Sequence, residues 1–217
     1  RRHQRPEQDA RIAVRPDDFR IRRFKHRAQT TTILAVDASG SQALHRLAEA
    51  KGAIELLLAE CYVRRDRVAL VAFRGQGATL LLPPTRSLVR AKRSLAALPG
   101  GGGTPLAAGI DAVRLLAESL RRRGESVVVV LLTDGRANVA RDGTAGRAQA
   151  ETDARAAATA LRAAELTALL IDTAPRPQPG AADLARAMGA TYLPLPHADA
   201  MALSRAVAAR AGPARAA

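Results

Sequence analysis

Short apolar runs alternate with amphipathic stretches along most of the chain. Runs typical of β-strands cover residues 32–36, 67–73, 78–82, 126–132, 167–172 and 191–195. Stretches with the period of a helix lie between most of these runs, at residues 44–61, 87–98, 104–123, 148–164, 181–188 and 199–210. The pattern predicts six strands and six helices in one α/β domain.

The order of these elements predicts how the strands are connected. Strands that alternate with helices form parallel sheets through right-handed crossovers, with helices on both faces. The run at 127–132 is continuously apolar, as expected of a central strand buried on both faces. Only Gly75-Gln76-Gly77 separates the second and third strands, which is a hairpin-length loop. We therefore predict a doubly wound, Rossmann-like, mostly parallel six-stranded sheet with one short antiparallel edge strand.

The first thirty residues differ from the rest of the chain. They are polar and charged, and they contain a basic cluster, namely Arg20, Arg22, Arg23, Lys25 and Arg27. The chain also begins with Arg rather than Met, so we expect it to be a piece of a larger protein. In this interpretation residues 1–30 are the end of a linker, and residues 31–212 form the folded domain.

The chain is strongly basic, with 34 Lys and Arg against 20 Asp and Glu and a formal net charge of +14. Such a charge attracts nucleic acid, anionic lipid or acidic protein segments. Nucleic-acid sites usually add stacking aromatic side chains, and this chain has only 2 Tyr and 3 Phe. The composition therefore argues against nucleic acid as the partner, and most of the arginines are expected on solvated faces.

Cysteine and hydropathy patterns bear on the compartment. The single cysteine, Cys61, excludes an internal disulfide and offers no metal-ligand spacing, which fits a reducing compartment. No apolar run approaches the ~18 residues that a transmembrane helix needs, and no signal peptide is visible. The sequence predicts a cytoplasmic location without membrane insertion.

Oxygen-bearing side chains gather at the predicted carboxyl ends of strands, where doubly wound sheets bind ligands. Asp37, Ser39 and Ser41 follow the first strand, Thr104 lies in a glycine-rich loop, and Asp134 follows the central strand. Hard oxygen ligands without a nearby His or Cys favour Mg²⁺ or Mn²⁺ over zinc. We expect the two serine hydroxyls to bind the ion directly and the carboxylates to hold its waters. Such an ion keeps an open position for a carboxylate of another protein.

Simpler interpretations exist for each segment alone. Asp37 and Ser39 would cap the following helix, and Thr104 would cap the helix that starts at Pro105. A haloacid-dehalogenase-type Mg²⁺ phosphatase needs a second Asp at the position of Ser39. Neither a phosphate-binding P-loop nor a nucleophile elbow fits these segments. Three oxygen-rich segments at one sheet edge favour an ion site over caps.

The ordered set Asp37-x-Ser39-x-Ser41, Thr104 and Asp134 resembles the metal-ion-dependent adhesion site of von Willebrand factor A, or integrin I, domains. The likeness extends over residues 31 to about 210 and implies that fold. More narrowly, the stretches "ILAVDASGS", "HRLAEAKGAIELLLAECYVRRDRVALVAFRG", "GGGGTPLAAGID" and "LLTDGRANVARDG" resemble the C-terminal integrin I domain of the D subunits of magnesium chelatases.

This resemblance implies a role in bacteriochlorophyll synthesis. D subunits assemble with AAA+ I subunits into a hetero-oligomeric ring, which drives a porphyrin-binding H subunit to insert Mg²⁺ into protoporphyrin IX. The integrin I domain would itself be non-catalytic and would dock subunits through metal-bridged acidic residues. Arg136 and Arg141, which follow Thr-Asp-Gly, are further candidates for contact with an acidic partner. A recruiting domain of another AAA+-linked system, such as a cobalt chelatase or a MoxR partner, is the alternative within this fold.

Overall fold

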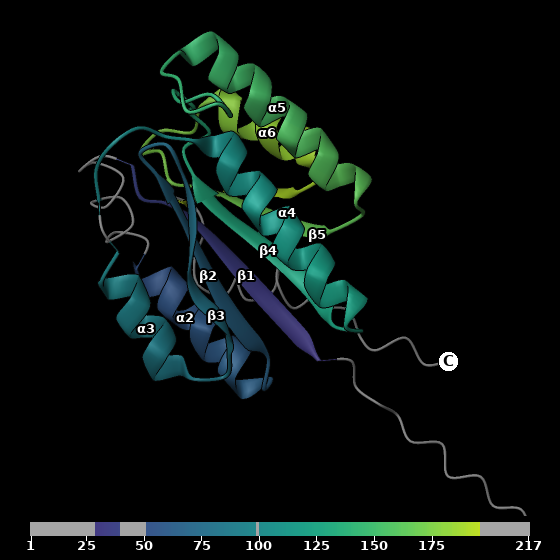
Figure 1. Cartoon of the computed structure of the whole chain (residues 1–217). Coiled ribbons are helices and arrows are strands. Elements are labelled where there is room, and N and C mark those ends of the chain that lie inside the picture. The colour runs from purple at the N-terminus through teal and green to yellow at the C-terminus, as the bar shows by residue number, and fades with distance from the viewer. Residues whose placement is uncertain (1–28, 40–50, 99, 196–217) are drawn as a thin grey trace, which may run out of the picture.

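The computed structural model describes residues 29–39, 51–98 and 100–195 of the chain. Six strands form one sheet in the order β3-β2-β1-β4-β5-β6 (Figure 1). They are β1 (Thr30–Asp37), β2 (Arg67–Arg74), β3 (Gly77–Thr85), β4 (Ser126–Thr133), β5 (Thr167–Asp172) and β6 (Thr191–Pro194). All neighbouring strands are parallel except β2 and β3, which pair antiparallel. The predicted mostly parallel sheet with an antiparallel edge strand is confirmed.

Helices cover both faces of the sheet. They are α2 (Lys51–Val63), α3 (Leu88–Ala96), α4 (Leu106–Arg122), α5 (Arg147–Ala163) and α6 (Pro179–Met188). Figure 1 shows α2 and α3 on one face and α4, α5 and α6 on the other. The predicted helix at 199–210 and the first part of the one at 44–61 lie outside the described residues. None of the described helices is long and apolar enough to cross a membrane.

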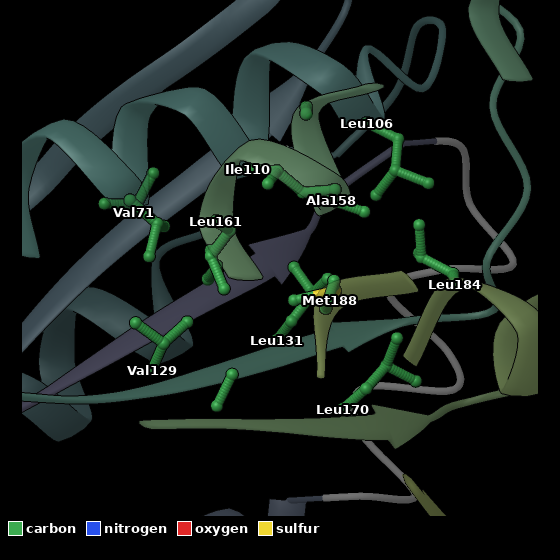
Figure 2. Packing of buried hydrophobic residues seen from close by; sticks show 14 of the residues in the cluster. Val71, Leu106, Ile110, Val129, Leu131, Ala158, Leu161, Leu170, Leu184 and Met188 are labelled. Atoms are coloured by element: carbon green, nitrogen blue, oxygen red, sulfur yellow. The ribbon is translucent and has the colours of Figure 1, made fainter. Parts of the chain in front are cut away.

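Alternation along the central strands produces two hydrophobic cores. In β1, Ile33 and Ala35 belong to the core under α4, α5 and α6, whereas Leu34 and Val36 belong to the core under α2 and α3. Figure 2 shows the first of these cores, where Leu131 of β4 packs among side chains that include Leu161 and Met188. Each fully buried aliphatic side chain contributes roughly 1.5–3 kcal/mol. Both cores therefore hold β1 and β4 firmly in register.

The edge strand β3 is longer than the sequence predicted. The apolar run at 78–82 covers only part of its nine residues, which continue through Pro83 and Pro84. Proline lacks the N–H that a central strand must donate, so it is tolerated at a sheet edge. Register shifts between Val68 and Leu70, and between Leu70 and Val71, accompany this extension. Hydropathy alone could not reveal it because the prolines interrupt the apolar pattern.

The sheet order fixes where a ligand can bind. From β1 the chain winds to β2 on one side, and from β4 it winds to β5 on the other. The winding therefore switches between β1 and β4, which are paired as far as Val36 and Leu132. Crevices at such switch points are the usual ligand sites of doubly wound sheets. Asp37 ends β1 and Asp134 follows β4, so both carboxylates stand at this crevice.

Candidate metal centre

Asp37 is held by hydrogen bonds at the end of β1. Its Oδ1 accepts the backbone N–H of Ser39 at 3.0 Å, and its Oδ2 accepts the hydroxyl of Thr133 at 3.2 Å. The residue is only 6% exposed. Both carboxylate oxygens therefore have fixed directions before any ligand arrives.

The hydroxyls of Ser39 and Thr104 meet across the crevice. Thr104 Oγ1 donates to Ser39 Oγ at 2.7 Å, which joins the end of β1 to the loop before α4. Helix α4 begins at Leu106, and its N-cap, Pro105, makes no side-chain cap hydrogen bond. The interpretation of Thr104 as the N-cap of this helix is therefore wrong, because its hydroxyl donates to Ser39 in the crevice instead.

Glycines bring Thr104 to this position. Gly101 and Gly102 adopt φ angles of +107° and +92°, which L-residues with side chains rarely do. A Cβ on Gly102 would lie 2.9 Å from the Cα of Gly75 in the β2–β3 turn. The Gly101 N–H also donates to the carbonyl oxygen of Ala38 at 3.1 Å. The glycine-rich loop can thus lie directly against the ends of β1 and β2.

Asp134 supplies the second buried carboxylate and is 8% exposed. Its Oδ1 accepts the backbone N–H of Arg136 at 3.1 Å. The pKa of Asp37 is raised from 3.8 to about 6, because burial and, less strongly, the charge of Asp134 outweigh the opposing hydrogen bonds from Ser39 and Thr133. Two neighbouring buried carboxylates are unfavourable as anions unless a cation accompanies them.

Two residues that support the centre were not singled out from the sequence. Thr133 Oγ1 donates to Asp37 and accepts the N–H of Gly135 at 3.1 Å. Asn138 Oδ1 accepts the N–H of Thr104 at 2.6 Å. Thr133 could have been recognised from the sequence, because it precedes Asp134 at the end of a predicted strand. Asn138 could not have been recognised in this way, because only the folded loop brings it to Thr104.

The structure brings four of the five predicted metal ligands together, namely Asp37, Ser39, Thr104 and Asp134. Ser41 lies outside the described residues. In the described ranges, no three or more His, Cys, Asp and Glu side chains are grouped so that they could hold a metal ion, so an ion here depends on hydroxyls as well as carboxylates. Carboxylate and hydroxyl oxygens fit Mg²⁺ or Mn²⁺, which prefer hard ligands and retain water.

The two predicted partner-binding arginines differ in their surroundings. Arg136 is exposed beside Asp134. Arg141 is paired with Asp111 of α4, with Nε and Nη2 each 2.9 Å from Oδ2. The guanidinium of Arg141 therefore already has a carboxylate within the chain, and Arg136 is the better placed of the two.

The fold agrees with comparisons to known proteins. Residues 32–136 match the family model of the von Willebrand factor type A domain. Von Willebrand factor type A from Catenulispora acidiphila has a TM-score of 0.54 and 17% identity over 85% of this chain and 42% of that chain. BatB from Bacteroides thetaiotaomicron has a TM-score of 0.60 and 19% identity over 84% and 98% of the two chains. Residues 32–136 are therefore similar to von Willebrand factor type A domains, and the chain has their fold.

Comparison with curated sequences shows which proteins with this domain are similar to the chain. A magnesium-chelatase 60 kDa subunit from Cereibacter sphaeroides is 57% identical over 204 residues, which cover 94% of this chain and 37% of the relative. A magnesium-chelatase 67 kDa subunit from Chlorobaculum tepidum is 40% identical over 88% of this chain and 32% of the relative. The chain is a homologue of the 60 and 67 kDa magnesium-chelatase subunits, and it spans about a third of their length.

Proposed function

We propose that this chain is the docking domain of the D subunit of an ATP-dependent magnesium chelatase, which inserts Mg²⁺ into protoporphyrin IX for bacteriochlorophyll. Homology along 94% of the chain to a 60 kDa magnesium-chelatase subunit supports this proposal. In this proposal the domain contributes binding rather than chemistry. Its compartment in this proposal is the cytoplasm.

The observation that carries the proposal is the grouping at the crevice of two buried carboxylates and a hydroxyl pair. Asp37 and Asp134 are 6% and 8% exposed, and the Ser39 and Thr104 hydroxyl oxygens are 2.7 Å apart. We propose that these four residues and Ser41 hold Mg²⁺ or Mn²⁺. When bound, the ion supplies an electrophilic centre for a carboxylate oxygen from another subunit.

Other residues of the chain hold the proposed metal ligands in position before the partner carboxylate binds. Thr133 and the Ser39 backbone orient the carboxylate of Asp37, and Asn138 fixes the backbone of Thr104. Because the hydroxyl ligands are neutral, the centre carries few negative charges of its own. It therefore keeps a preference for an anionic ligand from outside.

The partners in this proposal are the AAA+ I subunits and the porphyrin-binding H subunit. Acidic residues on one of them would reach the centre, while the hetero-oligomeric ring of I and D subunits provides ATP hydrolysis. The strongly basic chain suits an acidic protein surface, because opposite charge steers association and orients it.

Reconstitution of the full-length subunit with its I and H partners tests the proposal. Asp37→Ala, and Ser39→Ala combined with Ser41→Ala, are expected to abolish Mg²⁺-dependent assembly and chelatase activity while the fold persists. Asp142→Ala is the matched control, because this exposed carboxylate lies outside the crevice and, among the described residues, bonds only within its own turn. Full activity in the crevice variants would overturn the metal-bridged docking role.

A further inference from the structure

A cavity of about 420 Å³ opens beside Asp134. Its walls come from the turn after β4 and from the adjacent helices α5 and α6, which lie side by side in Figure 1. The charged and polar residues that line it beyond the metal centre are Arg136, Arg147, Glu151, Arg155, Gln178 and Asp183. The cavity and the metal centre therefore have the residue Asp134 in common.

The charges of this cavity favour an anion. Within the described part of the chain, the guanidinium groups of Arg136, Arg147 and Arg155 have no ion-pair partner. The carboxylate of Asp183 is already paired with Arg186 at 2.6 Å. The lining thus carries three arginines without an ion pair against Asp134, Glu151 and Asp183, and Arg186 compensates the charge of Asp183 from outside the lining. The three arginines resemble a preformed receptor for carboxylate, which guanidinium groups bind in bidentate fashion.

The helix ends add to the positive potential. Neither α5 nor α6 has a side-chain cap or an acidic residue in its first turn. The free N–H groups of these first turns carry partial positive charge. They strengthen the preference for an anion that the arginines establish.

The cavity wall is fixed relative to the metal centre. Gly135 adopts φ +77°, and a Cβ on it would lie 2.7 Å from the Cα of Ala181 in α6. On the other side, the Gly146 N–H before α5 donates to the Asn138 carbonyl oxygen at 2.9 Å, and Asn138 in turn binds Thr104. Binding in a preformed cavity avoids the cost of ordering loops.

We propose that this cavity binds a second carboxylate of the same partner segment that presents its first carboxylate to the ion. The proposal rests on the proposed function and deepens it, since the partner segment is then required to carry two acidic residues. Arg147 and Arg155 bind the second carboxylate, and Arg136, which follows Asp134 by two residues, lines the same cavity. Two fixed anion positions select the register of the segment as well as its charge.

Synthetic peptides on the full-length subunit test this inference. The probes are ten-residue Gly/Ser peptides that carry one glutamate, or two glutamates separated by two, three, four or five residues. Their binding is measured by fluorescence anisotropy with and without Mg²⁺. In the wild-type subunit, one of the two-glutamate peptides is expected to bind about tenfold more tightly than the one-glutamate peptide. Arg147→Glu combined with Arg155→Glu is expected to remove that gain and to leave the one-glutamate peptide unaffected.

The matched control is Arg90→Glu combined with Arg93→Glu, which makes the same charge change on exposed positions of α3 across the sheet. The inference is overturned if no two-glutamate peptide gains affinity, or if the gain survives in the Arg147 and Arg155 variant. Displacement of the peptide by single-stranded RNA only in the wild type would also overturn it, by marking the cavity as a nucleic-acid site. Loss of Mg²⁺ dependence for the one-glutamate peptide would instead contradict the proposed metal centre.

Discussion

Neutralising Asp37 is expected to stabilise the metal-free domain. The Asp37 carboxylate is buried at 6% exposure, and burial is the main reason that its pKa rises from 3.8 to about 6. Asp37→Asn removes the charge but keeps the shape. The amide oxygen can still accept the Ser39 N–H, and the amide N–H₂ can donate to Thr133 Oγ1, which retains a free lone pair.

The pKa difference sets the size of the effect. A native pKa about 2.2 above the unfolded value, at 1.36 kcal/mol for each pH unit, corresponds to ~3 kcal/mol. Between pH 3.8 and about 6 the folded state of the wild type holds the proton and the unfolded state loses it. The stability of the wild type therefore falls as pH rises through this window, and the full loss is present above it. The asparagine variant has no such loss.

Urea unfolding of the metal-free chain measures this difference. At about pH 7.5 the variant is expected to unfold with a free energy ~2–3 kcal/mol above that of the wild type, and at about pH 3.5 the difference should vanish. Asp142→Asn is the control, and its effect on stability is expected to have the opposite sign. Hydrogen bonds from Thr144 lower the pKa of that exposed carboxyl, so removal of its charge should lower the stability rather than raise it. A variant that is less stable than the wild type at the higher pH would refute the reasoning, because hydrogen bonding would then outweigh desolvation.

Three further predictions concern the scaffold and the crevice. Thr104→Val removes the hydroxyl that bonds Ser39 without touching a helix cap, so Mg²⁺ affinity measured by calorimetry should fall at least about tenfold while the Tm changes little. Gly135→Ala places a Cβ 2.7 Å from the Cα of Ala181 at φ +77°, and a loss of ~1–3 kcal/mol is expected in urea unfolding. An unchanged midpoint would mean that α6 shifts at no cost. Leu131→Ala opens a cavity in the core beneath α4, α5 and α6 and should cost ~2–5 kcal/mol in the same assay, with Mg²⁺ affinity per folded molecule preserved.

Much of the fold could be predicted from the sequence, because the central strands are buried on both faces. Their apolar runs leave little freedom, and the predicted limits at 126–132 and 167–172 differ from β4 and β5 by at most one residue. The edge strand β3 was less predictable, since its exposed positions and Pro83 and Pro84 follow no apolar pattern. A strand that is buried on both faces can therefore be predicted from a single sequence more accurately than an edge strand.

The candidate site was predictable where it depends on strand ends. Asp37 ends β1 and Asp134 follows β4, and parallel strands bring their carboxyl ends to one edge. Contacts made by loops could not be predicted. Nothing in the spacing indicates that Asn138 binds Thr104, or that Arg141 pairs with Asp111 thirty residues earlier. These contacts depend on the folded path of the loop after β4, which hydropathy does not determine.

The most direct test of the central claim is a Mg²⁺ titration of binding between the full-length subunit and its isolated partner subunits, without nucleotide. The wild type and Asp134→Ala are compared by sedimentation at equal protein concentration. If the crevice ion captures a partner carboxylate, the wild-type affinity rises with Mg²⁺ and that of Asp134→Ala stays at the metal-free level. Equal Mg²⁺ dependence in both proteins would contradict the account.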